Sequence, residues 1–146
     1  MNRHMMGVVS LAATALLTSG CRSIPEAVPY ARAFPESAVQ QEVLDIQVFR
    51  DETHVEFVNT TGREFGKSTL WLNQRYGYPI ELIGVGDYVK IALEDFRDEY
   101  SDKFRDASFF ATETPERLMM AQIETSDPAN EGKSVLLGLI VVGFRE

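Results

Sequence analysis

The feature that most restricts the fold of this chain is a series of short runs, from Glu42 onward, in which apolar and polar residues alternate. A period of two puts the apolar side chains on one face of an extended strand, which is the pattern of a half-buried β-strand. The apolar positions of the successive runs are Leu44, Ile46 and Val48; Val55 and Phe57; Leu70 and Leu72; Ile80 and Leu82; Val89, Ile91 and Leu93; Met119, Ala121 and Ile123; and Val135 to Val142. The pattern predicts an all-β domain of about seven strands.

Turn-forming residues separate the runs and favour short connections between consecutive strands. They are Asp51-Glu52, Asn59 to Gly66, Tyr76 to Pro79, Gly84 to Asp87 and Asp127 to Lys133. About a hundred residues are enough for one self-standing hydrophobic core. The sequence therefore predicts one domain over residues 42–146, an antiparallel β-sandwich.

One segment departs from the period of two. Phe96, Tyr100 and Phe104 recur every four residues, which would place them on one stripe of a helix. The same residues also fit a long connection whose aromatic side chains cover one end of the sandwich. The sequence leaves both possibilities open: a short helix near residues 94–106, or a loop.

The stretch before the first run is rich in proline. Pro25, Pro29 and Pro35 recur among alanine, serine and glutamate, and a helix does not tolerate that spacing. Residues 22–41 are therefore predicted to form an extended tether, which reaches at most roughly 60 Å at ~3.1 Å per residue.

The first residues have the layout of a secretory signal peptide. Arg3 gives a short positive region, Met5 to Leu17 is apolar and uncharged, and three small residues precede Cys21, the only cysteine of the chain. The apolar run is short for a membrane span. We expect residues 1–20 to be a signal peptide, and with a single cysteine we expect no intramolecular disulfide.

The run Leu17-Thr18-Ser19-Gly20-Cys21 resembles the lipobox of bacterial lipoproteins, although the family prefers leucine at the position of Thr18. The resemblance implies that Cys21 becomes the mature N-terminus and carries several acyl chains, which anchor a protein stably. Arg22 in the next position implies the outer membrane, facing the periplasm, in bacteria with two membranes. The alternative is an ordinary signal peptide followed by a cysteine that carries no lipid.

The seven predicted runs, with Trp71 on the third, resemble immunoglobulin-like and fibronectin-III-like domains. The disulfide that pairs the sheets of antibody domains is absent. The resemblance covers residues 42–146 and implies an architecture only, because a fold does not determine a function.

The stretch TTGREFGKST, Thr60 to Thr69, looks like a phosphate-binding loop and fails as one. Three residues separate Gly62 from Gly66, where the motif needs four, and a strand-like run follows where the motif needs a helix. The net charge of −8 at pH 7 disfavours nucleic acid. We therefore expect neither a nucleotide nor a nucleic acid as partner.

Catalytic and metal-binding residues are sparse. His54 is the one histidine of the mature chain, so no zinc site can be assembled, and no serine lies in a nucleophile motif. The acidic residues from Asp95 to Asp102 could ligate calcium, but interleaved arginine and lysine favour a solvated charged surface. The sequence predicts no catalytic residue, no metal and no cofactor, which leaves a hydrolase built on His54 as a distant alternative.

The candidate binding residues are aromatic. Trp71, Tyr76 and Tyr78, with Tyr88 nearby in the predicted strands, could form a row of rings that stacks on sugar or anchors a protein partner. The alternative is that Trp71 fills the core and the tyrosines pack the loops. The run from Val135 to Val142 is apolar on both faces, which fits either an interior strand or a face that awaits a partner.

Together these features predict a non-enzymatic, membrane-anchored envelope lipoprotein whose β-domain binds another envelope protein or supports an assembly. The alternative from the aromatic residues is a module that binds carbohydrate or cell wall.

Overall fold

The computed structural model of the chain describes residues 31–109, 111–128 and 132–144. The expected signal peptide, Cys21 and the first part of the tether lie outside the described residues. The strands are β1 (Gln40–Arg50), β2 (His54–Val58), β3 (Ser68–Leu72), β4 (Tyr76–Ile80), β5 (Tyr88–Ala92), β6 (Ala121–Ser126) and β7 (Ser134–Phe144), with one 3-10 turn, η1 (Leu93–Asp95). Within the described part of the chain, no helix has the length and apolar character needed to cross a membrane.

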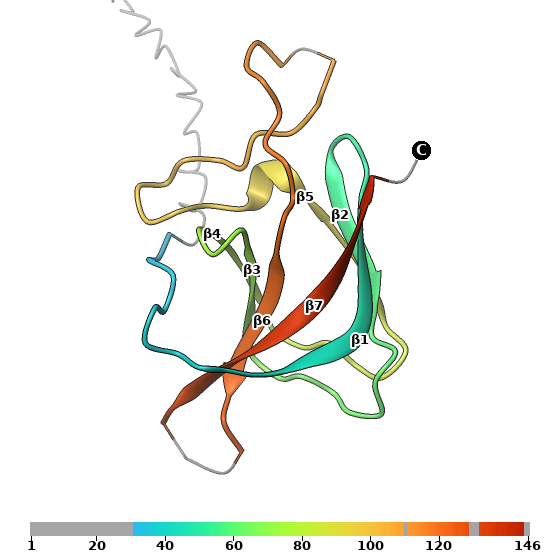
Figure 1. Cartoon of the computed structure of the whole chain (residues 1–146), viewed down its shortest axis with the longest axis vertical. Coiled ribbons are helices and arrows are strands. Elements are labelled where there is room, and N and C mark those ends of the chain that lie inside the picture. The colour runs from blue at the N-terminus through green and yellow to red at the C-terminus, as the bar shows by residue number, and fades with distance from the viewer. Residues whose placement is uncertain (1–30, 110, 129–131, 145–146) are drawn as a thin grey trace, which may run out of the picture.

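The seven strands form one sheet in the order β4-β3-β6-β7-β1-β2-β5, curled into a half-barrel (Figure 1). Neighbouring strands are antiparallel except β1 and β7, which are parallel. The all-β prediction is confirmed. The antiparallel sandwich is not what the structure shows, because all seven strands share one mixed sheet. Alternation along a strand determines which side chains face the core, but it does not determine which distant strand lies beside it.

The core fills the concave side of the sheet, and the predicted alternation explains it. Along β1, Leu44, Ile46 and Val48 are buried while Asp45 and Gln47 are exposed. Burying each such aliphatic side chain contributes roughly 1.5–3 kcal/mol relative to leaving it in water. The inner residues of the seven strands, together with Phe65, Ile83, Phe96 and Phe104 from the connections, make one core cluster.

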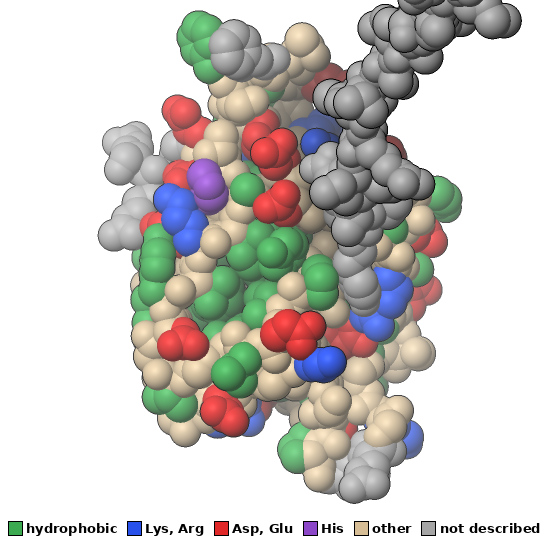
Figure 2. Space-filling model, turned by 180° about the vertical axis from the view of Figure 1, so that it is seen from behind, with side chains coloured by type: hydrophobic (Ala, Val, Ile, Leu, Met, Phe, Trp, Pro, Cys, Tyr) green, Lys and Arg blue, Asp and Glu red, His purple; other side chains and the backbone are tan. Residues whose placement is uncertain are grey.

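The curl brings the two edges of the sheet toward each other. Gly77 of β4 and Arg97, which follows η1, exchange backbone hydrogen bonds of 2.8 and 3.2 Å. On the open side, Tyr78 and Ile80 of β4 and Val89 of β5 pack against the core and remain partly exposed. From behind, Figure 2 shows hydrophobic side chains gathered in a hollow with charged side chains around it.

The helix considered for residues 94–106 is absent, apart from the single turn of η1. Instead, the chain folds back on itself, with a backbone bridge between Arg97 and Lys103. Asp98 causes the reversal, since its carboxylate accepts the backbone N–H groups of Tyr100 (2.9 Å) and Asp102 (2.8 Å). The side chains of Phe96 and Phe104 then enter the core, while Tyr100 is exposed, so the three rings share no stripe.

Candidate functional site

The structure separates the three predicted aromatic residues onto two faces of the sheet. Trp71 of β3 lies opposite Gly77 of β4, so the neighbours of Gly77, Tyr76 and Tyr78, point to the other face. Trp71 is therefore on the outer face, and the two tyrosines are on the inner face. The three rings form no common row.

Tyr76 and Tyr78 pack within the half-barrel. Tyr76 is 2% exposed, its ring meets Phe104 edge-on at 5.2 Å, and its hydroxyl donates a 2.8 Å hydrogen bond to Glu116. Burial, followed by that hydrogen bond, raises the pKa of Tyr76 to about 12. Tyr78 is half-buried, with its ring centroid 5.4 Å from that of Phe96.

Trp71 is fully buried, but it does not belong to the core cluster. Residues of the predicted tether cover it from outside: the Phe34 ring meets it edge-on at 5.3 Å, and the Arg32 guanidinium lies 5.2 Å from the ring centroid. The indole N–H donates to Glu124 at 2.8 Å, and Arg32 forms an ion pair with the same carboxylate oxygen. Trp71 is thus buried on the outer face under Arg32 and Phe34, so it neither fills the core nor belongs to an exposed row of rings.

Apolar side chains are exposed on the outer face of a different part of the sheet. Strand β7 contributes Ile140 (41% exposed) and Val142 (51%), and its neighbour β1 contributes Val43 (60%) and half-buried Phe49. Strand β2 contributes Val58 (40%), and β5 contributes Tyr88 (58%). We call these six residues the outer apolar face. In the strand register, Ile140 is level with Gln47 on β1, and Val58 is level with Tyr88 on β5, so polar Gln47 lies among these apolar residues.

A pocket of about 430 Å³ opens on this face. It is lined by Asp45, Gln47, Phe49, Glu56, Phe57, Val58, Thr60 and Tyr88. Its walls combine apolar rings and methyl groups with two carboxylates, and no lysine or arginine is among the lining residues. This chemistry suits an apolar side chain flanked by a positive charge.

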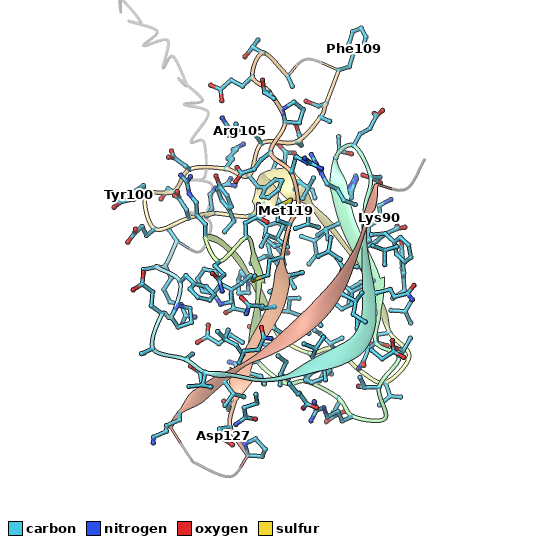
Figure 3. The ribbon with its side chains drawn as sticks, viewed as in Figure 1. Lys90, Tyr100, Arg105, Phe109, Met119 and Asp127 are labelled. Atoms are coloured by element: carbon cyan, nitrogen blue, oxygen red, sulfur yellow. The ribbon has the colours of Figure 1, made fainter. Side chains whose placement is uncertain are left out.

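Glu56 links the pocket to the edge strand. Its carboxylate accepts a hydrogen bond from the Tyr88 hydroxyl and lies 4.0 Å from the Lys90 ammonium. Figure 3 shows Lys90 beside β1 and β2, whereas Tyr100, Arg105 and Phe109 lie on the connections at one end of the sheet. The exposed apolar residues of β7, β1, β2 and β5 therefore stand apart from the exposed rings of the loops.

The residues considered for catalysis and calcium form no reactive centre within the described residues. His54 Nδ1 lies 2.9 Å from Thr53 Oγ1 and 3.6 Å from Asp51 Oδ1, and its described contacts include no serine. Asp98 accepts two hydrogen bonds from Arg75, at 2.9 and 2.7 Å. Residues 31–109, 111–128 and 132–144 contain no group of three or more His, Cys, Asp or Glu placed to hold a metal.

Val58 was not predicted as a site residue, and Tyr88 was considered only as a ring near the aromatic candidates. The signal that pointed to their surface was the last apolar run, Val135 to Val142. On β7, Leu137, Leu139 and Val141 face the core, and the other side of the strand carries Ile140 and Val142.

No protein-family model matches this sequence, and neither a curated protein nor a solved structure matches it. The outer apolar face is therefore assessed by its own geometry.

Proposed function

We propose that this chain is a non-enzymatic bacterial envelope lipoprotein whose β-domain binds another envelope protein through the outer apolar face. Residues 1–20 would be removed on export, and lipid on Cys21 would hold the domain at a membrane. The residues from Arg3 to Cys21 support export and lipid anchoring, and Arg22 supports a location at the outer membrane, facing the periplasm.

The observation that carries the binding function is the exposure of Ile140 and Val142. Both lie on β7, the central strand of the sheet. By contrast, Tyr78, Ile80 and Val89 at the sheet edges pack against the core, so their partial exposure has a structural explanation. Exposed apolar side chains beside a pocket, with polar groups among and around them, are typical of a protein-binding surface.

The carbohydrate-binding alternative has less support from the same residues. Trp71 and Tyr76 are at most 2% exposed and cannot stack on a sugar while they are covered. Tyr78 alone is half-buried, and a single ring does not make a stacking row. The experiment below distinguishes a protein partner from a glycan partner.

The test is photocrosslinking in intact cells, with a photoreactive amino acid at position 142 of the full chain. We expect one recurrent protein adduct that Ile140→Lys removes, because a charge in the apolar face opposes docking. Met119 is the matched control position: it is 69% exposed but lies outside the sheet. Equal adducts from both positions, or adducts indifferent to Ile140→Lys, would contradict the proposal, and cell-wall glycan in place of protein would favour the alternative.

Two further variants separate folding and anchoring from binding. Leu137→Lys places a charge in the core, where Leu137 is 3% exposed, and is expected to unfold the domain, whereas Ile140→Lys is expected to leave it folded.

Cys21→Ser is expected to move the chain from the membrane fraction to the soluble fraction and to abolish acylation seen by mass spectrometry. Retention in the membrane without acylation would argue against the lipoprotein assignment.

A further inference from the structure

The segment that covers Trp71 lies outside the sheet and is held by side chains. Figure 1 shows residues 31–39, in blue, passing beside β3 and β4 before they enter β1. The backbone hydrogen bonds described for residues 32–38 stay within the segment: Glu36 N–H to Phe34 C=O and Ala38 N–H to Pro35 C=O, both 2.9 Å. The first backbone bond to the sheet is from Leu136 N–H to Val39 C=O, at 3.2 Å. Among the described side-chain contacts of residues 32–38, those of Arg32 and Phe34 with Trp71 and Glu124 attach the segment to the sheet.

The surface beneath the segment is shaped for such an occupant. A Cβ atom at Gly77 would stand 2.9 Å from Cζ3 of Trp71, so the absence of a side chain at Gly77 leaves room for the indole. The indole N–H orients Glu124, which is 7% exposed and whose described cationic partner is Arg32. A buried carboxylate without a counter-charge is costly, so this site favours an occupant that carries a cation.

The segment does not fill the space around it. A cavity of about 280 Å³ lies on the side of Arg32 and Glu124, and one of about 560 Å³ lies on the side of Phe34 and Arg75. A segment with bulkier side chains beside its basic and aromatic residues therefore has room to bind.

We propose that Trp71 and Glu124 form a second protein-binding site, which recognises a segment of a partner protein with a basic residue followed two positions later by an aromatic residue. The chain's own Arg32 and Phe34 occupy this site as an internal ligand and show the chemistry that it accepts: a cation stacked on an indole and paired with a buried carboxylate, and a ring packed edge-on. The site is separate from the outer apolar face and does not depend on it.

The test uses the full chain in detergent and the fluorescence of Trp71, the only tryptophan. Arg32→Ala with Phe34→Ala is expected to red-shift the emission and expose it to acrylamide quenching. Adding the peptide ARAFPESA, which has the sequence of residues 31–38, is expected to reverse both changes, and the reversal should saturate as the peptide concentration rises. The matched control peptide has alanine in place of the arginine and the phenylalanine and is expected to have no effect.

A third substitution tests the role of the carboxylate. Glu124→Gln in the double variant is expected to weaken peptide binding by about tenfold or more, since charge-assisted hydrogen bonds are the stronger ones. The native chain is also expected to bind a fluorescent copy of the peptide at least about tenfold more weakly than the double variant, because its own segment competes at a high effective concentration.

Three results would overturn the proposal. The first is Trp71 emission in the double variant that is as shielded as in the native chain. The second is equal binding of the two peptides. The third is a native chain that dimerises with its Trp71 still shielded and becomes monomeric in the double variant, which would show that copies exchange their segments instead of binding a partner. Circular dichroism verifies that the double variant keeps its sheet; should it unfold, Arg32→Ala alone is titrated with the same two peptides and judged by the same results.

Discussion

The indole of Trp71 lies against the backbone of Gly77, its partner across β3 and β4, so closely that a Cβ on Gly77 would meet three ring atoms at 2.9, 3.1 and 3.2 Å. The ring is also hydrogen-bonded to Glu124 and covered by Phe34, so it has little freedom to move aside.

Gly77→Ala is therefore expected to destabilise the domain by roughly 1–3 kcal/mol, the usual cost of overpacking a filled site. Urea unfolding followed by Trp71 fluorescence measures the change in the free energy of unfolding. Gly66→Ala is the matched control, because a Cβ at Gly66 has nothing within 4 Å. Equal stability of the two variants would mean that the indole moves at little cost.

Asp98→Asn is expected to lower the free energy of unfolding at pH 7 by about 1–2 kcal/mol, since it removes the charge-assisted hydrogen bonds from Arg75. Burial alone would raise the pKa of Asp98, but the hydrogen bonds from Arg75 and from the backbone of Asp102 and Tyr100 hold that pKa below its usual value. The stabilisation is thus present above the unfolded pKa and is lost as pH falls through the lower folded pKa.

Acid unfolding curves of the native chain and of the Asp98→Asn variant measure this difference directly. The gap in stability between the two chains should be widest near neutral pH and should narrow in acid. Glu99→Gln, an exposed neighbour, serves as the control and should follow the native curve. A gap that stays constant from neutral pH into acid would show that the ionisation of Asp98 does not matter.

The Tyr76 hydroxyl predicts a loss of stability in alkali. The pKa of Tyr76 is about 12 in the folded chain, against about 10 for an ordinary tyrosine. Between pH 10 and pH 12, the Tyr76 hydroxyl therefore loses its proton in the unfolded chain and keeps it in the folded chain. The contribution is therefore fully present below pH 10 and decreases toward pH 12. The free energy of unfolding, measured as a function of pH, should lack this decrease in the Tyr76→Phe variant. The Tyr100→Phe variant, which changes an exposed ring, should retain it.

Arg50→Met is expected to leave the free energy of unfolding unchanged within about 1 kcal/mol, or to raise it. Arg50 is 8% exposed, its Nε and Nη2 have no hydrogen-bond partner among the described residues, and its guanidinium lies 5.7 Å from the Phe104 ring centroid. Burial lowers the pKa of Arg50, against the opposing charges of Asp106, Asp51 and Glu116. Urea unfolding measures the outcome, and a loss above about 2 kcal/mol would show that those carboxylates compensate the buried charge.

The alternation of apolar and polar residues predicted most of the strands, but it did not predict which strands lie side by side in the sheet. The alternation of Leu44, Ile46 and Val48 is a property of one strand, and the structure confirms it. The parallel pairing of β1 with β7 joins residues far apart in sequence, and alternation carries no information about that neighbour. The four-residue spacing of Phe96, Tyr100 and Phe104 was ambiguous because hydrogen bonds accepted by Asp98 compete with a helical backbone.

The candidate sites show the same limit. The apolar run from Val135 to Val142 indicated a strand with two apolar faces, and the structure shows that its outer residues Ile140 and Val142 are exposed. The role of Arg32 and Phe34 was not predictable, since a proline-rich segment has no period that would reveal contacts with Trp71.

The place of β7 in the sheet also determines the order in which the domain can assemble. Without β7, the strands divide into two three-stranded pieces, β4-β3-β6 and β1-β2-β5, and each piece has an open edge where β7 belongs. During synthesis, residues 134–144 emerge after all the other strands, so both edges stay unpaired until then and are exposed to wrong pairing. Of the seven described strands, the one that is made last joins the two halves, and this sheet is complete only once β7 is present.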